Sequence, residues 1–279
     1  MFSSVLFPTD FSSHAKDELD CLTSFPHVAA IHLVHVVRPF PIHVVEKLVR
    51  DQSEEYLAAA KQYLLALNPS VAVTMQVAQG RDLAGTILAA AADAGADLVV
   101  LSGYATNFRA GILLGRVPPT VLCRTGSTDV LVMPNRVIDR FNGKEHSKFC
   151  RNIFTTILCP TDFAETSHKA IACAGAMPGV REIVLLHAGP EGAGAVPDAE
   201  ARLEALRASL AGTKAKVRVR DEHGRPARTI ARVAEEEDVS LVWMSVEGKG
   251  CLHAFLAGSI IEETLSLVKR PLMVIRSAG

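Results

Sequence analysis

The chain has 279 residues, 49% of them hydrophobic, and a formal net charge of -1. This length is enough for about two domains, and the near-neutral charge gives no general attraction to nucleic acid or to an anionic membrane. No apolar run reaches the roughly 18 residues of a membrane span, and no basic stretch of a signal peptide is visible. We therefore expect a soluble, cytoplasmic protein with no membrane insertion and no nucleic-acid partner.

The first predicted strand, at residues 5–7, runs into the segment Pro8-Thr9-Asp10-Phe11. The same four residues recur at 160–163, again after an apolar run. The two copies lie 152 residues apart, whereas solenoid repeats have periods of about 20–50 residues. A repeat of this size corresponds to a whole domain, so the chain is interpreted as two copies of one fold.

Later strands follow in the same order in both copies. Residues 31–36 correspond to 183–188, 98–102 to 241–245, and 130–133 to 272–275. The run 98–101 is apolar throughout, which is typical of a strand buried on both faces of a parallel sheet. Helices are predicted in between, for example at 51–67 before Pro69 and from Pro226 onwards. This alternation predicts two α/β domains, each with an open parallel sheet.

We expect a first domain over residues 1–135, a linker over 136–152 and a second domain over 153–279. The basic linker is interpreted as a solvated connector rather than a contact with an anionic partner. The acidic run 235–238 is interpreted as a solvated face, and the apolar stretch 108–114 as a packed helix rather than a partner-binding face.

Six cysteines are scattered along the chain without a Cys-x-x-Cys pair or the spacing of a zinc site. In a chain of this length, reduced thiols in the core are the better interpretation than disulfides. His32 and His35 lie three residues apart on a predicted strand, so they face opposite sides and cannot chelate one ion. The sequence predicts no metal site.

Ligands of an open parallel sheet bind beyond the carboxyl ends of its strands. Asp10 and Asp162 follow the first strand of each copy, where a carboxylate can accept hydrogen bonds from a ribose hydroxyl or a base amine; capping of the next helix is the alternative. After the fourth strand, the second copy has Gly248 and then Gly258-Ser259 near a helix start. Backbone amides in such a loop suit a phosphate, although a plain strand-to-helix loop would have the same composition.

The first copy is degraded in this loop. It keeps Gly103 and Gly115, but Thr106 stands in place of the middle glycine and Arg116 in place of the serine. Pro118-Pro119 removes amide donors near the helix start. The second copy is therefore the better candidate.

Together these motifs resemble those of a tandem universal stress protein of the UspA family. That family carries Pro-Thr-Asp after strand one, a His near the end of strand two, and Gly-x2-Gly-x9-Gly-Ser/Thr after strand four. The second half matches except that Ser245 replaces the first glycine, and only the linker lies outside the resemblance. The resemblance implies an adenine nucleotide alpha hydrolase-like fold with strand order 3-2-1-4-5, and an internal pseudo-dimer paired through the last strands; a homodimer is a further possibility.

The resemblance also implies an adenine-nucleotide site, because members with the intact motif bind ATP. We expect ATP or AMP, with Mg²⁺ as an optional component, mainly in the second domain. The residues expected at the second site are Pro160, Thr161, Asp162, Ala188, Met244, Ser245, Gly248, Gly258, Ser259 and Ile260, and those at the degraded first site are Asp10, Gly103 and Gly115.

Three functions stay open at this point. The first is a regulatory or signalling protein of the stress response, which binds an adenine nucleotide and an unidentified protein partner. The second is a scaffold in which both sites are vestigial and no nucleotide binds; Ser245, Thr106 and Arg116 favour it. The third is a slow nucleotide hydrolase, which is the weakest because no residue supplies an evident general base; no catalytic residue is predicted.

Overall fold

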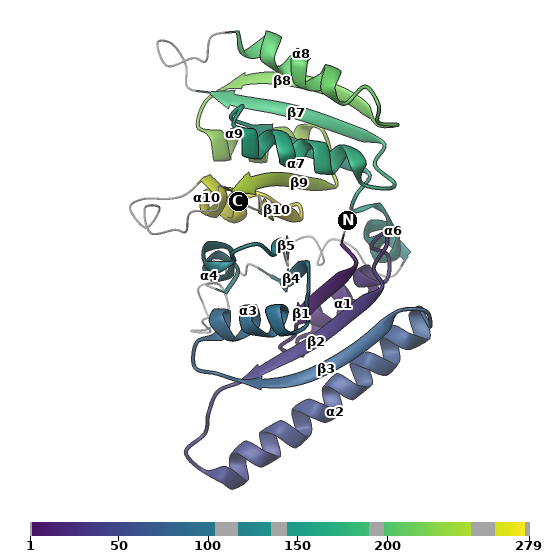
Figure 1. Ribbon diagram of the computed structural model, residues 1–279, viewed down its shortest axis with the longest axis vertical. Helices are drawn as coiled ribbons and strands as arrows, with labels where there is room; N and C mark the ends of the chain where they lie inside the picture. Colours follow the sequence, from purple (N-terminus) through teal and green to yellow (C-terminus); the bar gives the residue numbers. More distant parts are fainter. Residues whose placement is uncertain (1, 104–116, 135–143, 190–197, 247–259, 277–279) are drawn as a thin grey trace. The chain divides into compact units, whose positions relative to one another are not determined.

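The computed structural model describes residues 2–103, 117–134, 144–189, 198–246 and 260–276 (Figure 1). The chain divides into two compact units, Met1–Arg151 (unit 1) and Asn152–Gly279 (unit 2). Each unit is an α/β fold, as predicted.

Unit 1 contains β1 (Ser4–Pro8), α1 (Ser13–Leu22), β2 (Ala30–Val37), α2 (His43–Leu67), β3 (Ala72–Gln79), α3 (Leu83–Asp93), β4 (Leu98–Ser102), α4 (Val117–Arg124), β5 (Asp129–Met133) and α6 (Lys144–Asn152), whose last residue is assigned to unit 2. Its strands pair in parallel in the order β3-β2-β1-β4-β5. This is the predicted order.

Unit 2 contains β6 (Thr156–Thr161), α7 (Glu165–Ala176), β7 (Glu182–Gly189), α8 (Ala199–Ser209), β8 (Lys216–His223), α9 (Pro226–Glu236), β9 (Leu241–Val246), α10 (Ile260–Leu267) and β10 (Leu272–Arg276). Its order, β8-β7-β6-β9-β10, repeats that of unit 1, and its paired strands are again parallel. The pairing of the two units through their last strands stays a prediction.

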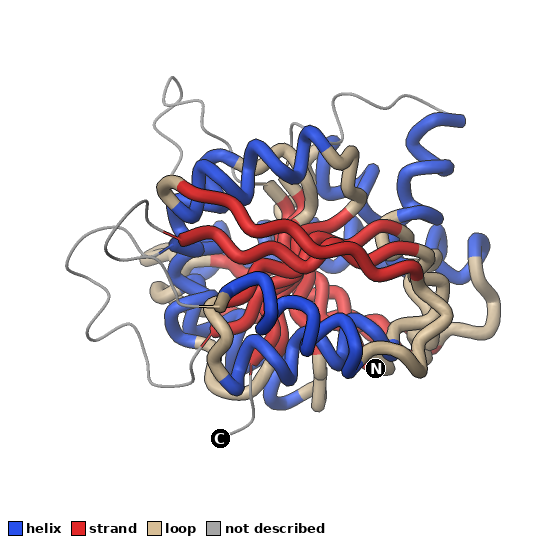
Figure 2. Tube along the Cα trace, turned by 90° about the horizontal axis from the view of Figure 1, so that it is seen from above, coloured by secondary structure: helices blue, strands red, loops and turns tan. Residues whose placement is uncertain are grey.

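The cores are built from the apolar strands predicted from the sequence. All four residues of the run 98–101 are buried, as are residues 241–244 in unit 2. Helices flank the twisted strands (Figure 2), so the central strands lose both faces to packing. Trp243 is a core residue: it is 1% exposed, and its indole nitrogen donates a hydrogen bond to the carbonyl of Ala170 at 2.9 Å.

One helix start was predicted correctly and another was not. Pro226 opens α9 in the first turn, where its missing N–H removes no helical hydrogen bond, as expected. Helix α2 begins at His43, eight residues before the predicted start at 51, and Ile42 at its N-cap gives no side-chain hydrogen bond. No capping residue marked this start, so the sequence missed it. The predicted helix at 108–114 lies outside the described residues.

The prediction of a solvated linker over residues 136–152 is wrong for residues 144–152. Residues 144–152 form α6, and His146 and Cys150 on this helix are buried. The expectation of reduced thiols is also wrong here, because Cys150 forms a disulfide with Cys21 of α1, with Cα atoms 4.4 Å apart. The two cysteines are separated by 129 residues, so no sequence spacing revealed the pair. Cys159 is buried and free, as predicted.

The acidic run at 235–238 is largely exposed, as predicted, and Glu237 is half-buried. Glu237 pairs with Arg218 at 2.5 Å and with Arg220 at 2.8 Å, and Arg220 also reaches Glu236 at 3.0 Å. These arginines lie on the outer strand β8, so the run ties α9 to the edge of the sheet. Among the described residues, no helix is long and apolar enough to cross a bilayer.

Candidate functional site

The turn after the first strand has the same geometry in both units. Phe11 and Phe163 adopt left-handed backbone angles, with φ of 62° and 64°. The N–H of Phe11 donates a hydrogen bond to Thr9 Oγ1 at 3.1 Å, and the N–H of Phe163 donates one to Thr161 Oγ1 at 2.9 Å. A left-handed phenylalanine costs about 1–2 kcal/mol, and it is kept in both copies of the turn.

The aspartates of the turn stay exposed at the carboxyl ends of their strands. Asp10 Oδ1 accepts a hydrogen bond from Ser12 N at 2.9 Å, and Asp162 Oδ1 accepts one from Ala164 N at 3.0 Å. Neither aspartate caps the next helix: the N-cap of α1 is Ser12, and that of α7 is Ala164. The capping alternative is therefore wrong. One carboxylate oxygen holds the turn, which leaves the other for a ligand.

A histidine stands beside each turn, but with different partners. In unit 1, His35 Nδ1 donates to the carbonyl of Thr9 at 2.8 Å, and its ring stacks on Phe11 with centroids 4.4 Å apart. In unit 2, His187 Nδ1 bonds Asp221 Oδ1 at 2.7 Å. The carbonyl of Thr9 can only accept, so it fixes the proton of His35 on Nδ1.

His32 is bonded through both ring nitrogens, to Ser4 Oγ at 3.0 Å and Thr74 Oγ1 at 2.7 Å. It is a satisfied polar residue of the sheet.

Unit 1 has a cavity of about 290 Å³ at this edge of the sheet. It lies between the ends of β1 and β4, and its polar side chains include the turn aspartate and two histidines. The lining residues are Pro8, Thr9, Asp10, Ser12, His14, His35, Val36, Leu83, Ile87, Leu101, Ser102, Gly103 and Val117. The volume is near the lower end of the about 300–1,000 Å³ of small-molecule sites. The predicted residues Asp10 and Gly103 thus share one cavity, whereas Gly115 lies outside the described residues.

The predicted residues of unit 2 gather at the equivalent edge. Pro160 and Thr161 end β6, Met244 and Ser245 lie near the end of β9, and β6 and β9 pair directly. The other members are placed as follows: Asp162 after β6, Ala188 near the end of β7, Ile260 at the start of α10, and Gly248, Gly258 and Ser259 outside the described residues.

The helices that would face a phosphate differ in their first turns. In unit 1, α4 begins Val117-Pro118-Pro119, so two of the amides that a helix start normally offers are missing. In unit 2, α10 keeps its amides, but its first turn carries Glu262 and Glu263. Negative charge there competes with a phosphate for the helix N-terminus. Arg225 lies 3.4 Å from Glu263 and offsets part of this charge.

Sequence reasoning missed two side chains beside the turn of unit 2. The guanidinium carbon of Arg202 lies 4.2 Å from the ring centre of Phe163, a cation–π contact, and Asp221 binds His187. Arg202 comes from α8 and Asp221 from β8, so neither is near the motif in sequence. The recurring Phe after Pro-Thr-Asp was a visible signal, but no motif pointed to its partners.

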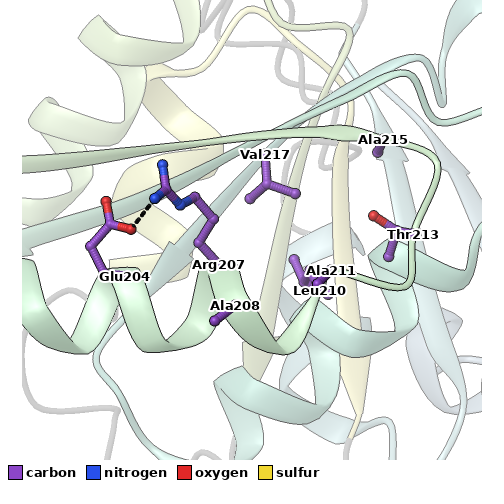
Figure 3. A pocket seen from close by; sticks show the side chains of 8 residues that line it. All are labelled: Glu204, Arg207, Ala208, Leu210, Ala211, Thr213, Ala215 and Val217. Carbon is purple, nitrogen blue, oxygen red and sulfur yellow. Dashed lines mark ion pairs between the residues drawn. The ribbon is translucent and has the colours of Figure 1, made fainter.

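A second cavity, of about 470 Å³, lies in unit 2 between the end of α8 and the start of β8 (Figure 3). Its two charged lining residues, Glu204 and Arg207, pair with each other at 2.5 Å. It opens at the amino end of β8, whereas ligands of open α/β sheets bind at carboxyl ends. We therefore place the candidate site at the Pro-Thr-Asp edge.

The sequence profile and the solved structures that resemble this chain point to the same family. The sequence matches the profile of the universal stress protein family over residues 1–134 and 154–276. A universal stress protein from Archaeoglobus fulgidus DSM 4304 has a similar structure, with a TM-score of 0.76 and 21% identity over 98% of this chain and 96% of that one. A putative universal stress protein from Pseudomonas aeruginosa UCBPP-PA14 is also similar, with a TM-score of 0.63 and 16% sequence identity. The match covers 99% of this chain and 93% of that one. No curated protein has a significantly similar sequence.

Proposed function

We propose that this chain, which belongs to the universal stress protein family, binds an adenine nucleotide and acts as a regulatory protein. The ligand is ATP or AMP, with Mg²⁺ accompanying the phosphates, and the main site lies in unit 2. Binding would bias the surface that unit 2 presents to a protein partner.

The cavity of unit 1 is the observation that carries this proposal. It is lined by Thr9, Asp10 and Ser102, whose equivalents in unit 2 are Thr161, Asp162 and Ser245. The cavity thus coincides with the place where the sequence predicts the nucleoside part of the ligand. An exposed carboxylate and a hydroxyl at this edge match the hydrogen-bonding needs of a ribose and an adenine amine.

The prolines of α4 favour unit 2 for the phosphates. A phosphate at a helix start is held by bare amides, and Pro118 and Pro119 supply none. The start of α10 has no proline, and Arg225 reduces the effect of Glu263. The acidic first turn still disfavours a bare triphosphate, so we expect Mg²⁺ to increase the affinity for ATP more than that for AMP.

Calorimetric titration of the full chain with ATP and with AMP, each with and without Mg²⁺, tests the proposal. Gly258→Asp should abolish ATP binding, because a side chain with a negative charge would block the loop amides. The matched control is Gly115→Asp, the equivalent change in the first copy, which should leave binding intact. No binding by the unaltered chain at millimolar ATP with Mg²⁺ would refute the proposal. Loss of binding only in Gly115→Asp would move the site to unit 1.

A second candidate is a scaffold with two vestigial sites. The acidic first turn of α10 and the prolines of α4 favour it, since each weakens the phosphate part of one site. Acid extraction of freshly purified protein separates the two candidates. The nucleotide-binding protein should release adenine nucleotide below one equivalent per chain, and the scaffold should release none.

A further inference from the structure

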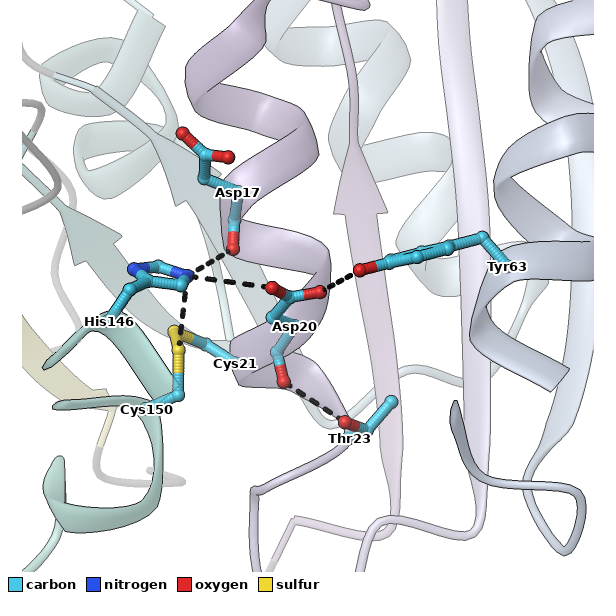
Figure 4. The surroundings of a disulfide bond; sticks show 7 residues. All are labelled: Asp17, Asp20, Cys21, Thr23, Tyr63, His146 and Cys150. Carbon is cyan, nitrogen blue, oxygen red and sulfur yellow. Dashed lines mark hydrogen bonds and ion pairs between the residues drawn. A yellow bond between two sulfur atoms is a disulfide. The ribbon is translucent and has the colours of Figure 1, made fainter. Parts of the chain in front are cut away.

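Three side chains that commonly ligate metals meet inside unit 1, away from the candidate nucleotide site. Cys21 of α1 and His146 and Cys150 of α6 are all buried, and their potential ligand atoms lie within 4.8 Å of one another (Figure 4). His146 Nε2 is 3.4 Å from Cys150 Sγ and 3.9 Å from Asp20 Oδ2. Two sulfurs and an imidazole therefore converge on one point, and the Asp20 carboxylate lies beside this group, next to the imidazole.

The local sequence explains the convergence. His146 and Cys150 are four residues apart on α6, so they lie on the same face of that helix. Asp20 and Cys21 are neighbours in the last turn of α1. The prediction of no metal site from sequence spacing missed this group, because its two halves come from opposite ends of unit 1.

We propose that Cys21, Cys150, His146 and Asp20 form a zinc site when the disulfide is reduced. Cys sulfur, His nitrogen and Asp oxygen are all ligands that Zn²⁺ takes in proteins, and these four side chains supply the number that a tetrahedral site needs. The site belongs to a dithiol form of unit 1, because a thiolate and not a disulfide sulfur is the metal ligand.

The distance between His146 and Cys150 suits tetrahedral coordination, whereas the two sulfurs have to separate once the disulfide is reduced. Bonds of about 2.3 Å to sulfur and about 2.0–2.1 Å to nitrogen place S and N ligands roughly 3.5 Å apart in a tetrahedron. The 3.4 Å between Cys150 Sγ and His146 Nε2 already meets this value. Asp20 Oδ2 lies 3.9 Å from His146 Nε2, and its carboxylate is half-buried at the edge of the group, so it has to move toward the sulfurs to complete the site.

Neighbouring groups are arranged to support the ligands. The Tyr63 hydroxyl donates to Asp20 Oδ1 at 2.5 Å, which orients the carboxylate and leaves Oδ2 toward His146. Nδ1 of His146 is buried without a hydrogen-bond partner among the described residues. In the disulfide form, Nε2 of the ring donates to the carbonyl of Asp17 at 2.8 Å.

The disulfide form converts to the zinc-bound form in two steps. A dithiol reductant transfers two electrons and two protons to the Cys21–Cys150 bond, so the protein gains two thiols and the reductant becomes a disulfide. Zn²⁺ then displaces one proton from each thiol, and the proton of His146 moves from Nε2 to Nδ1, so the neutral ring binds the metal through Nε2 and two protons are released. The hydrogen bond to the Asp17 carbonyl is lost in this step and is replaced by the bond to zinc.

Unit 2 provides an internal contrast. Cys173 of α7 occupies the position of Cys21, but it is exposed and free, and Ala172 replaces Asp20. The proposed site is thus particular to unit 1, and Cys173 serves as a matched control.

The test uses the full chain, reduced with a phosphine, incubated with Zn²⁺ alone and dialysed. We expect one zinc per chain in the reduced protein and none in the oxidised protein. Co²⁺ in place of Zn²⁺ should give thiolate-to-cobalt charge-transfer bands. His146→Asn should lower the zinc affinity by on the order of 100-fold while the disulfide still forms, and Tyr63→Phe by about tenfold. Cys173→Ser should leave the affinity unchanged.

Two results would overturn the proposal. One is a reduced protein that stays folded by circular dichroism and holds no zinc. The other is an affinity that His146→Asn leaves unchanged, since zinc would then sit elsewhere. If reduction unfolds unit 1, refolding on addition of Zn²⁺ supports the site, and continued unfolding contradicts it.

Discussion

Glu18 of α1 in unit 1 corresponds in position to Ala170 of α7 in unit 2, and Val100 of β4 corresponds to Trp243 of β9. In unit 1 the buried Glu18 accepts a hydrogen bond from Ser102, a residue of the cavity wall. In unit 2 the Trp243 ring fills the space and bonds the Ala170 carbonyl. The same backbone thus encloses a carboxyl group in one unit and an indole in the other.

This difference gives the two units different dependences of stability on pH. Burial raises the pKa of Glu18 well above its usual range, and its Oε1 has no hydrogen-bond partner among the described residues. Such a group destabilises unit 1 at neutral pH. Unit 2 has an apolar core at this place and a charged outer strand, so the two units should respond to pH in opposite ways.

The largest effect is expected from Trp243→Ala. Removing this fully buried ring leaves a cavity and breaks the indole hydrogen bond to the Ala170 carbonyl, and we expect unit 2 to lose about 3–5 kcal/mol of unfolding free energy. Urea unfolding followed by far-ultraviolet circular dichroism measures the loss, since the variant has no tryptophan left. The matched change Val100→Ala in unit 1 should have a clearly smaller effect. Equal losses would contradict the assigned difference between the cores.

A smaller effect, with a distinct pH dependence, is expected from Glu18→Gln. Because the folded-state pKa of Glu18 is raised, its contribution to stability is fully present below the unfolded-state pKa and is lost as pH rises through the folded-state pKa. The variant should lose this dependence and be more stable at pH 8 by about 1–3 kcal/mol. Thermal unfolding at several pH values measures it. The exposed Glu55→Gln serves as control and should change neither the stability nor its pH profile.

The smallest effect is expected from Arg220→Gln. Gln76 on β3 of unit 1 occupies the position that corresponds to Arg220 on β8, so this change gives unit 2 the residue that unit 1 has there. Hydrogen bonds from Arg218 and then Arg220 lower the pKa of Glu237, so this pairing stabilises unit 2 above the usual carboxyl pKa and is lost as pH falls through the lowered value. We expect a loss of about 1 kcal/mol at pH 7 that shrinks in high salt. Fluorescence of Trp243 during urea unfolding reports it; a loss unaffected by salt would mean that packing, not charge, is responsible.

The sequence predicted the strands, their order and the turn aspartates, because these depend on local signals: apolar runs, a recurring motif and a family pattern. It did not predict the contacts made by residues far apart in the chain. Arg202 over Phe163, Asp221 on His187 and the Cys21–Cys150 bond each join elements whose meeting is decided by packing of the whole unit. The early start of α2 was missed for a different reason, because no capping side chain marks it.

The disulfide also turns most of unit 1 into a closed covalent ring. Everything between residues 21 and 150, including strands β2 to β5, lies inside this loop, whereas β1 lies on the short arm before it. A single cut by a protease inside the ring would open it without releasing a fragment, and the two pieces would part only after a reductant is added. The chain therefore carries a built-in tether, which holds unit 1 together after backbone damage for as long as its surroundings stay oxidising.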